Sequence, residues 1–252
     1  MLKKIFKCIC EIVIMTKAVI IYILKCEVFL EDVLVQMIAV GWKSVLIVFL
    51  SSFFIGMVLA LQIGYASINF FSEPVFVATT LGFSLVMELS PVLTAIIITA
   101  KVGATITAEL GAMKITEQLD ALYTLGTNPI KYLAVSRFLA CFFMLPILTV
   151  FSNVFGICGG MILSKSMWKI TISTYFSEIL SSITVKTFFH GFIKSFFFAL
   201  IVVIISCYKG FNAGNNTKEV GKSTTNSVTY SMITIFIFDY FLTSLLVTLK
   251  IK

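Results

Sequence analysis

Five apolar runs, each long enough to cross a lipid bilayer, constrain what this chain can fold into. They cover approximately residues 44–66, 77–100, 133–163, 187–207 and 227–249, and Pro146 is predicted to interrupt the third. The polar, aromatic residues 164–186 are predicted to hold a short helix on the membrane surface. A helix needs about 20 apolar residues to span the hydrocarbon core, and there only helices and closed barrels satisfy the backbone. Charged residues make up 12% of the chain, against about 25% in a soluble domain. We therefore predict an all-α integral membrane protein with five transmembrane helices.

The segment before these runs, residues 1–40, is apolar but interrupted by charges. Lys4, Lys7 and Glu11 share one face of a helix, opposite a row of isoleucines, which favours an amphipathic helix lying in the membrane interface. A signal peptide is disfavoured because Glu11 breaks the apolar run and no small-residue cleavage site follows. A first span over residues 12–24 remains an alternative, although it is short and contains a lysine.

The distribution of lysines predicts the orientation of the bundle. Lysines occur at the N-terminus and in the loops after the second and fourth runs, and the loop after the first run has none. The positive-inside rule places the N-terminus, a helix at 107–125 and the loop at 208–226 on the cytoplasmic or stromal side. Three lysines after the third run oppose this orientation.

The stretch from Glu88 to Pro129 joins two different elements. Glu88 lies inside the second apolar run, and Pro91 follows it without an N–H to donate, which loosens the helix beside the carboxylate. An amphipathic helix is predicted over residues 107–125. Gly126 and the residues up to Pro129 indicate the end of that helix and a turn.

Three charged residues lie well inside apolar runs: Glu88, Lys194 and Asp239. A charge at the bilayer centre costs at least about 2.5 kcal/mol on insertion scales. A carboxylate–lysine–carboxylate set could pair within the bundle and lower this cost for all three. The sequence does not decide between a purely structural ion network and a functional site at these three residues. His190, the only histidine, is interpreted as a packing or helix-end residue rather than a catalytic base.

The 107–125 helix has an apolar face and a polar face. Ile115, Leu119 and Leu122 share the first, and Glu117 and Asp120 lie on the second. This pattern favours a surface that binds another protein. A solvated connector between spans is the alternative.

No motif predicts catalysis, a cofactor or a metal. Gly221-Lys222-Ser223 resembles the end of a phosphate-binding loop, but that motif needs a glycine at Asn216. The six cysteines lack CxxC spacing and histidine partners. The net charge of +7 is dispersed between apolar runs, as expected for lysines at helix ends rather than a nucleic-acid surface. We expect no cofactor, no metal site and no nucleic-acid partner.

The chain resembles the MlaE family of permeases, the membrane subunits of ABC transporters that work with MCE-type lipid-binding proteins. The resemblance is carried, in order, by ELSPVLTAIIITAKVGATITAELGAMKITEQLDALYTLGTNPIKYL, LPILTVFSNVFGICGG, IKSFFFA and VGKSTTNSVTYSMITIFIFDYFLT. It covers roughly residues 30–250 and looks closest to cyanobacterial and plastid-encoded members. The heavy use of Phe, Ile, Lys and Asn is typical of the codon bias of an AT-rich genome. Together with this bias, the resemblance favours a plastid inner envelope membrane, with a bacterial inner membrane as the alternative.

The resemblance implies a fold and partners. The chain would be one domain, with an interfacial segment at 1–40 and a five-helix bundle at 41–250, working as a homodimer. Residues 107–125 would form a cytoplasmic coupling helix seated in a separate ATPase subunit. An MCE-domain protein on the far side would exchange lipid with a central cavity of the dimer.

The resemblance also implies site residues. Glu88, Lys194 and Asp239 would contact the substrate. The contacts to the ATPase would come from Glu109, Gly111, Met113, Thr116, Glu117, Gln118, Asp120 and Ala121. Two positions depart from the family pattern, because Met87 and Lys101 stand where arginine is usual.

These observations together predict a lipid-transport permease without catalytic residues of its own. A membrane enzyme acting on lipids is an alternative, but it would need a nucleophile, a metal set or a histidine base in the bundle. A passive scaffold or channel is a further alternative, and it would need no ATPase.

Overall fold

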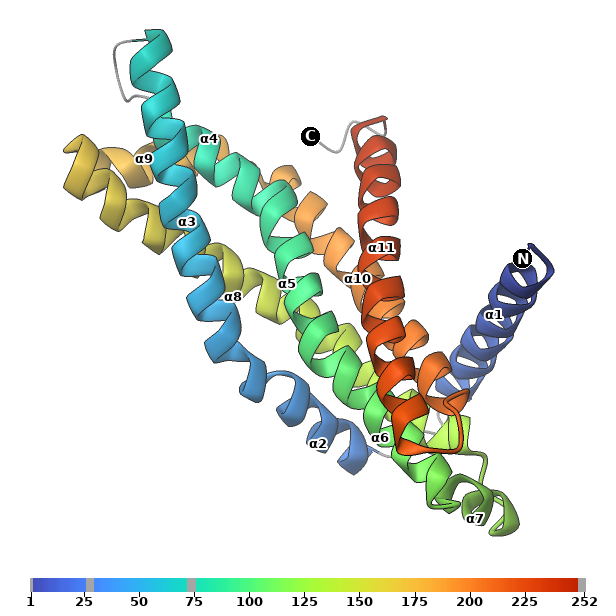
Figure 1. The fold of residues 1–252 in the computed structure, drawn as a ribbon. Helices are drawn as coiled ribbons and strands as arrows, with labels where there is room; N and C mark the ends of the chain where they lie inside the picture. Colours follow the sequence, from blue (N-terminus) through green and yellow to red (C-terminus); the bar gives the residue numbers. More distant parts are fainter. Residues whose placement is uncertain (1, 26–29, 72–75, 249–252) are drawn as a thin grey trace. The chain divides into compact units, whose positions relative to one another are not determined.

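The structure is a computed structural model that describes residues 2–25, 30–71 and 76–248 (Figure 1). Within these ranges the chain consists of helices joined by short turns and contains no strand. The side chains of Lys4 and Lys7, which contribute to the predicted polar stripe, lie outside the described part of the chain.

Eleven α-helices follow one another in the described ranges. They are α1 (Leu2–Leu24), α2 (Leu30–Val40), α3 (Trp42–Phe71), α4 (Val77–Ser84), α5 (Ser90–Ile98), α6 (Ala104–Ile115), α7 (Gln118–Thr124), α8 (Val135–Trp168), α9 (Ile172–Ser182), α10 (Val185–Phe211) and α11 (Thr217–Thr248). Three π-helical turns connect some of them: η1 (Leu85–Leu89), η2 (Thr99–Gly103) and η3 (Ile130–Ala134).

Five helical stretches are long and apolar enough to cross a membrane, which confirms the predicted number. They are Leu30–Asn69, Val77–Ile115, Ile130–Trp168, Val185–Phe211 and Thr217–Thr248. An N-terminal helix, α1, precedes them, as predicted. The chain is therefore an all-α integral membrane protein.

Two predicted boundaries differ from the structure. The third span is not interrupted at Pro146, because α8 continues through it. The predicted loop at 208–226 is largely helical, since α10 ends at Phe211 and α11 begins at Thr217. The predicted short helix after the third span is present as α9.

Contacts between Cα atoms divide the chain into two compact units, each built from three stretches. The first unit comprises Met1–Lys43, Ile98–Met144 and Ala199–Ile235. The second comprises Ser44–Ile97, Leu145–Phe198 and Phe236–Lys252.

In the second unit, α3 and α8 pack backbone against backbone (Figure 1). A Cβ atom added to Gly56 would lie 1.9 Å from the carbonyl oxygen of Gly156. One turn away, the hydroxyls of Ser52 and Ser152 form a buried hydrogen bond of 2.7 Å. Small residues permit this close approach, which drives helix association where lipid removes the hydrophobic driving force.

In the first unit, a buried hydroxyl joins α6, α10 and α11. Thr107 Oγ1 lies 3.0 Å from the carbonyl oxygens of Gly103 and Ser206 and 2.9 Å from Ser227 Oγ. The side chains of Thr107, Ser206 and Ser227 are fully buried. Hydrogen bonds of this kind hold transmembrane helices together.

Candidate functional site

Glu88 lies in the π-helical turn η1, directly before α5. The N–H of Ser90 donates to the carbonyl oxygen of Leu85, one residue further back than in an α-helix. Pro91, which follows, has no N–H, so the local loosening predicted from the sequence is present as this π turn. Such turns occur frequently at functional sites.

Helix α10 approaches this turn very closely because position 191 is glycine. A Cβ atom on Gly191 would lie 2.1 Å from the carbonyl oxygen of Val86. The missing side chain lets the backbone of α10 rest against η1. Lys194, about one turn further along α10, is thereby brought within reach of Glu88.

The ammonium group of Lys194 has three oxygen partners. Its Nζ lies 2.5 Å from Glu88 Oε2, 2.9 Å from Asp239 Oδ1 and 2.6 Å from Thr243 Oγ1. The lysine side chain is fully buried. A lysine ammonium has three protons to donate, so its hydrogen-bonding capacity is used completely.

We refer to Glu88, Lys194, Asp239 and Thr243 as the charge cluster. The Glu88 and Asp239 side chains keep 35% and 23% of their surface exposed. Thr243 Oγ1 also lies 2.8 Å from the carbonyl oxygen of Asp239 and 3.2 Å from Glu88 Oε1. Pairing of the three charges is thus confirmed. Thr243 was not anticipated, although it lies one helical turn after Asp239.

The predicted helix over residues 107–125 is two helices. Helix α6 is the end of the second span, which runs to Ile115, and α7 begins at Gln118. Between them Glu117 adopts a left-handed backbone conformation with a φ of 58°. The N–H of Glu117 bonds the carbonyl oxygen of Lys114, which closes the end of α6. We refer to residues 109–125 as the coupling segment.

The predicted end of this segment at Gly126 is confirmed. Gly126 has a φ of 74°, its N–H bonds the carbonyl oxygen of Tyr123, and the N–H of Thr127 bonds that of Leu122. These two bonds form the Schellman motif that commonly ends a helix at glycine. The side chain of Asn128 then accepts the N–H of Ile130 at 2.9 Å and starts the next helical stretch.

Most of the residues predicted to contact an ATPase lie on the surface. Exposed positions are Glu109, Thr116, Glu117, Gln118, Asp120 and Ala121. Met113 is half-buried. Gly111 differs: it is buried, and a Cβ atom there would lie 2.8 Å from Val220. Gly111 therefore serves packing within the chain rather than its surface.

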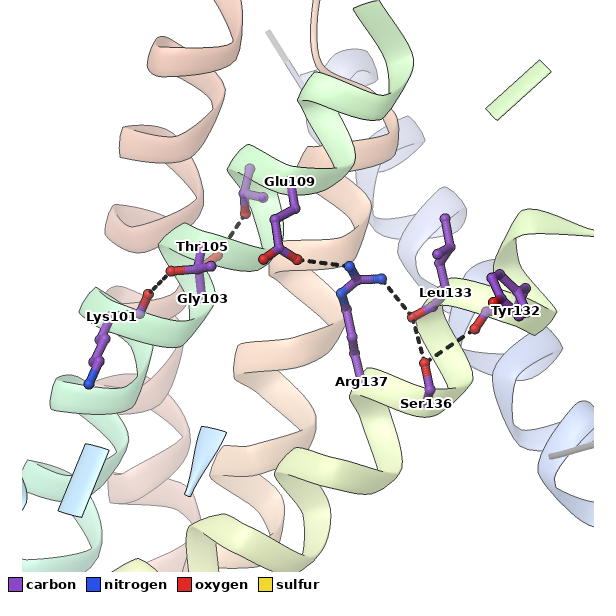
Figure 2. A network of polar contacts seen from close by, with 9 residues as sticks. Lys101, Gly103, Thr105, Glu109, Tyr132, Leu133, Ser136 and Arg137 are labelled. Carbon is purple, nitrogen blue, oxygen red and sulfur yellow. Dashed lines mark hydrogen bonds and ion pairs between the residues drawn. The ribbon is translucent and has the colours of Figure 1, made fainter. Parts of the chain in front are cut away.

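An ion pair that no sequence pattern predicts holds the start of the coupling segment to α8. Figure 2 shows Glu109 and Arg137 pointing toward one another, with Arg137 Nη2 2.8 Å from Glu109 Oε2. Arg137 is buried, and its Nη1 donates to the carbonyl oxygen of Leu133 at 3.1 Å. Arg137 is the only arginine in the chain, but nothing in the sequence pairs it with a residue 28 positions away.

The N-terminal helix α1 is hydrogen-bonded to the same unit. The hydroxyl of Tyr208 donates to Glu11 Oε2 at 2.7 Å, and Asn128 Nδ2 donates to Tyr22 Oη at 3.2 Å. A cavity of about 410 Å³ lies between α1, the coupling segment and α10. Contacts from α1 thus reach α10 and the turn that follows α7.

No group of three or more histidine, cysteine, aspartate or glutamate side chains gathers in metal-binding geometry within the part of the chain searched. Cys10, Cys141, Cys158 and Cys207 are free thiols there. The side chains of Cys8 and Cys26 lie outside the described part of the chain.

Comparison with known proteins gives consistent matches along most of the chain. The family model described as "Permease MlaE" matches residues 33–245. A probable ABC transporter permease protein of Rickettsia typhi is 38% identical over 224 residues, 89% of this chain and 86% of that protein. One from Synechocystis sp. is 38% identical over 232 residues, 92% and 88% of the two chains. The probable permease ycf63 of Pyropia yezoensis is 38% identical over 207 residues, 82% and 78%.

Proposed function

The chain belongs to the MlaE permease family, and from this premise we propose that it moves phospholipid or glycolipid as the membrane subunit of an ABC-type transporter. Permeases are transport components rather than enzymes. In the proposed assembly two copies form a homodimer, a separate ATPase subunit supplies the energy, and an MCE-domain protein exchanges lipid with the dimer.

The observation that carries this proposal is the charge cluster inside the helical bundle. Partly exposed carboxylates within membrane-spanning helices normally face a bundle interior or a watery cavity, because lipid solvates them poorly. Glu88 and Asp239 retain exposed surface while Lys194 is fully buried. A cavity at the dimer axis that receives a lipid headgroup would give these carboxylates a polar environment.

The coupling segment supports the second part of the proposal. Its exposed residues include Glu117, Gln118 and Asp120 around the break between α6 and α7. The segment continues the second span, so the helical stretch Val77–Ile115 leads from the ATPase contact to the turn that carries Glu88. Closure of the ATPase on the coupling segment would be transmitted along this stretch.

We place the transporter in the plastid inner envelope membrane, with a bacterial inner membrane as the alternative. The matches in Synechocystis and Pyropia support the first location, and the match in Rickettsia is compatible with the second. The coupling segment would face the stroma or the cytoplasm, according to the distribution of lysines.

Purification in a gentle detergent, followed by mass spectrometry of proteins and lipids, tests the proposed function. We expect an ATPase subunit, an MCE-domain protein and a stoichiometric lipid to co-purify. A protein that purifies without an ATPase and without lipid would favour a membrane scaffold or a lipid-modifying enzyme instead.

A further inference from the structure

The only cation of the charge cluster is unavailable to a ligand. Lys194 donates its three ammonium protons to Glu88, Asp239 and Thr243 and has no exposed surface. A phosphate could bind the ammonium only by displacing one of these oxygens. Lys194 therefore positions the two carboxylates rather than binding a headgroup itself.

The surface that the cluster presents consists of hydrogen-bond acceptors. Glu88 and Asp239 keep 35% and 23% of their side-chain surface exposed, and an ionised carboxylate only accepts. Thr243 is also partly exposed, but its hydroxyl already donates to the carbonyl oxygen of Asp239. Two carboxylates and one ammonium give a formal charge of −1. The neighbouring side chain, Met87, is buried and adds no charge.

We propose that this site selects lipid headgroups that donate hydrogen bonds and carry no net negative charge. The inference rests on the proposed function, since it assumes that lipid reaches the cluster. A headgroup ammonium or sugar hydroxyl supplies the donors that Glu88 and Asp239 lack. A phosphate monoester brings further negative charge and acceptors to two carboxylates in a medium of low dielectric constant, where the repulsion is strong.

Competitive retention of three lipids tests the selectivity. The full-length protein is reconstituted in nanodiscs with equal amounts of phosphatidylethanolamine, monogalactosyldiacylglycerol and phosphatidic acid of matched acyl chains. Lipids retained after detergent washes are quantified by native mass spectrometry. We expect at least one of the two donor lipids to be enriched about tenfold over phosphatidic acid, the size of one hydrogen bond to a charged group. Comparison of the ammonium lipid with the galactolipid identifies which donor the site takes.

Changing the charge of the cluster should change the preference. The double variant Glu88→Gln with Asp239→Asn leaves Lys194 as the only charge, and the preference should turn toward phosphatidic acid. The triple variant that adds Lys194→Met has no charge and should retain lipid without a headgroup preference. Glu31→Gln, a charge loss at an exposed position on α2, is the control and should retain lipids as the unchanged protein does.

The outcomes separate this inference from the proposed function. Equal or preferential retention of phosphatidic acid by the unchanged protein would overturn the selectivity and leave lipid transport standing. Release of all three lipids by the washes, with none left bound, would remove the proposed function itself. If the double variant does not fold, the triple variant decides, because a headgroup preference that persists without charges contradicts the inference.

Discussion

Lys194 shows how one residue determines the chemistry of the membrane interior in this chain. Its ammonium is fully buried and acceptable there only because Glu88, Asp239 and Thr243 accept all three protons. A buried ion pair adds little stability compared with an apolar replacement of the whole set, but the loss of one partner leaves an uncompensated charge. The three charges therefore behave as one unit.

This coupling predicts non-additive effects of mutation. Lys194→Met alone leaves two adjacent carboxylates without their cation and should lower the free energy of unfolding by about 3–5 kcal/mol. Adding Glu88→Gln and Asp239→Asn should restore most of that loss. Thermal unfolding in detergent measures both effects, with the exposed Lys222→Met as the control. An equally large loss in the triple variant would show that the three residues do not act together.

At the scale of elements, two backbone features place the functional side chains. The π turn η1 turns Glu88 toward α10, and Gly191 allows α10 to lie against that turn. The left-handed Glu117 separates α6 from α7 and so defines the exposed tip of the coupling segment. These backbone conformations set the geometry of both sites.

Gly191→Ala should disturb the charge cluster without touching it. The added Cβ meets the carbonyl oxygen of Val86, a backbone atom that cannot rotate away. Overpacking of this kind costs about 1–3 kcal/mol, and we expect a lower unfolding temperature in detergent. Gly221→Ala, where nothing lies within 4 Å of the new atom, is the matched control. Equal stability of the two variants would contradict the close approach of α10 to η1.

Reversal of charge on the coupling segment should separate the permease from its ATPase. Glu117→Lys with Asp120→Lys replaces two exposed acidic side chains and should abolish co-purification of the ATPase while the protein remains inserted in the membrane. The same charge change at Glu31 and Asp32, on α2, should leave co-purification intact. Undiminished binding of the ATPase by the first variant would exclude this segment as the docking element.

The sequence was sufficient for the features that depend on hydropathy and on the cost of charge. The five spans follow from apolar length, and pairing of Glu88, Lys194 and Asp239 follows from the expense of leaving any of them alone in lipid. The helix end at Gly126 follows from turn chemistry.

Features that depend on tertiary contact could not be predicted in this way. Arg137 meets Glu109 only because α8 lies against α6 (Figure 2). The sequence places Gly111 on the surface of a predicted helix, but in the structure Val220 covers it. Pro146 is predicted to interrupt a span, but α8 continues through it, as membrane helices permit when neighbouring groups satisfy the freed backbone.

At the scale of the whole molecule, the first and fifth spans are the least buried of the five. In the proposed homodimer they would offer the most surface to lipid and to a second copy. In the proposed transport of lipid, energy from a partner ATPase would pass from the coupling segment to the charge cluster.

Lipid transfer in a reconstituted system tests this central claim most directly. Liposomes carrying the permease with its ATPase and MCE-domain partner are supplied with a fluorescent lipid, and transfer is followed with and without ATP. We predict ATP-dependent transfer with the unchanged permease and its loss with Glu117→Lys and Asp120→Lys. Transfer that is indifferent to ATP, or absent from the intact assembly, would contradict the account.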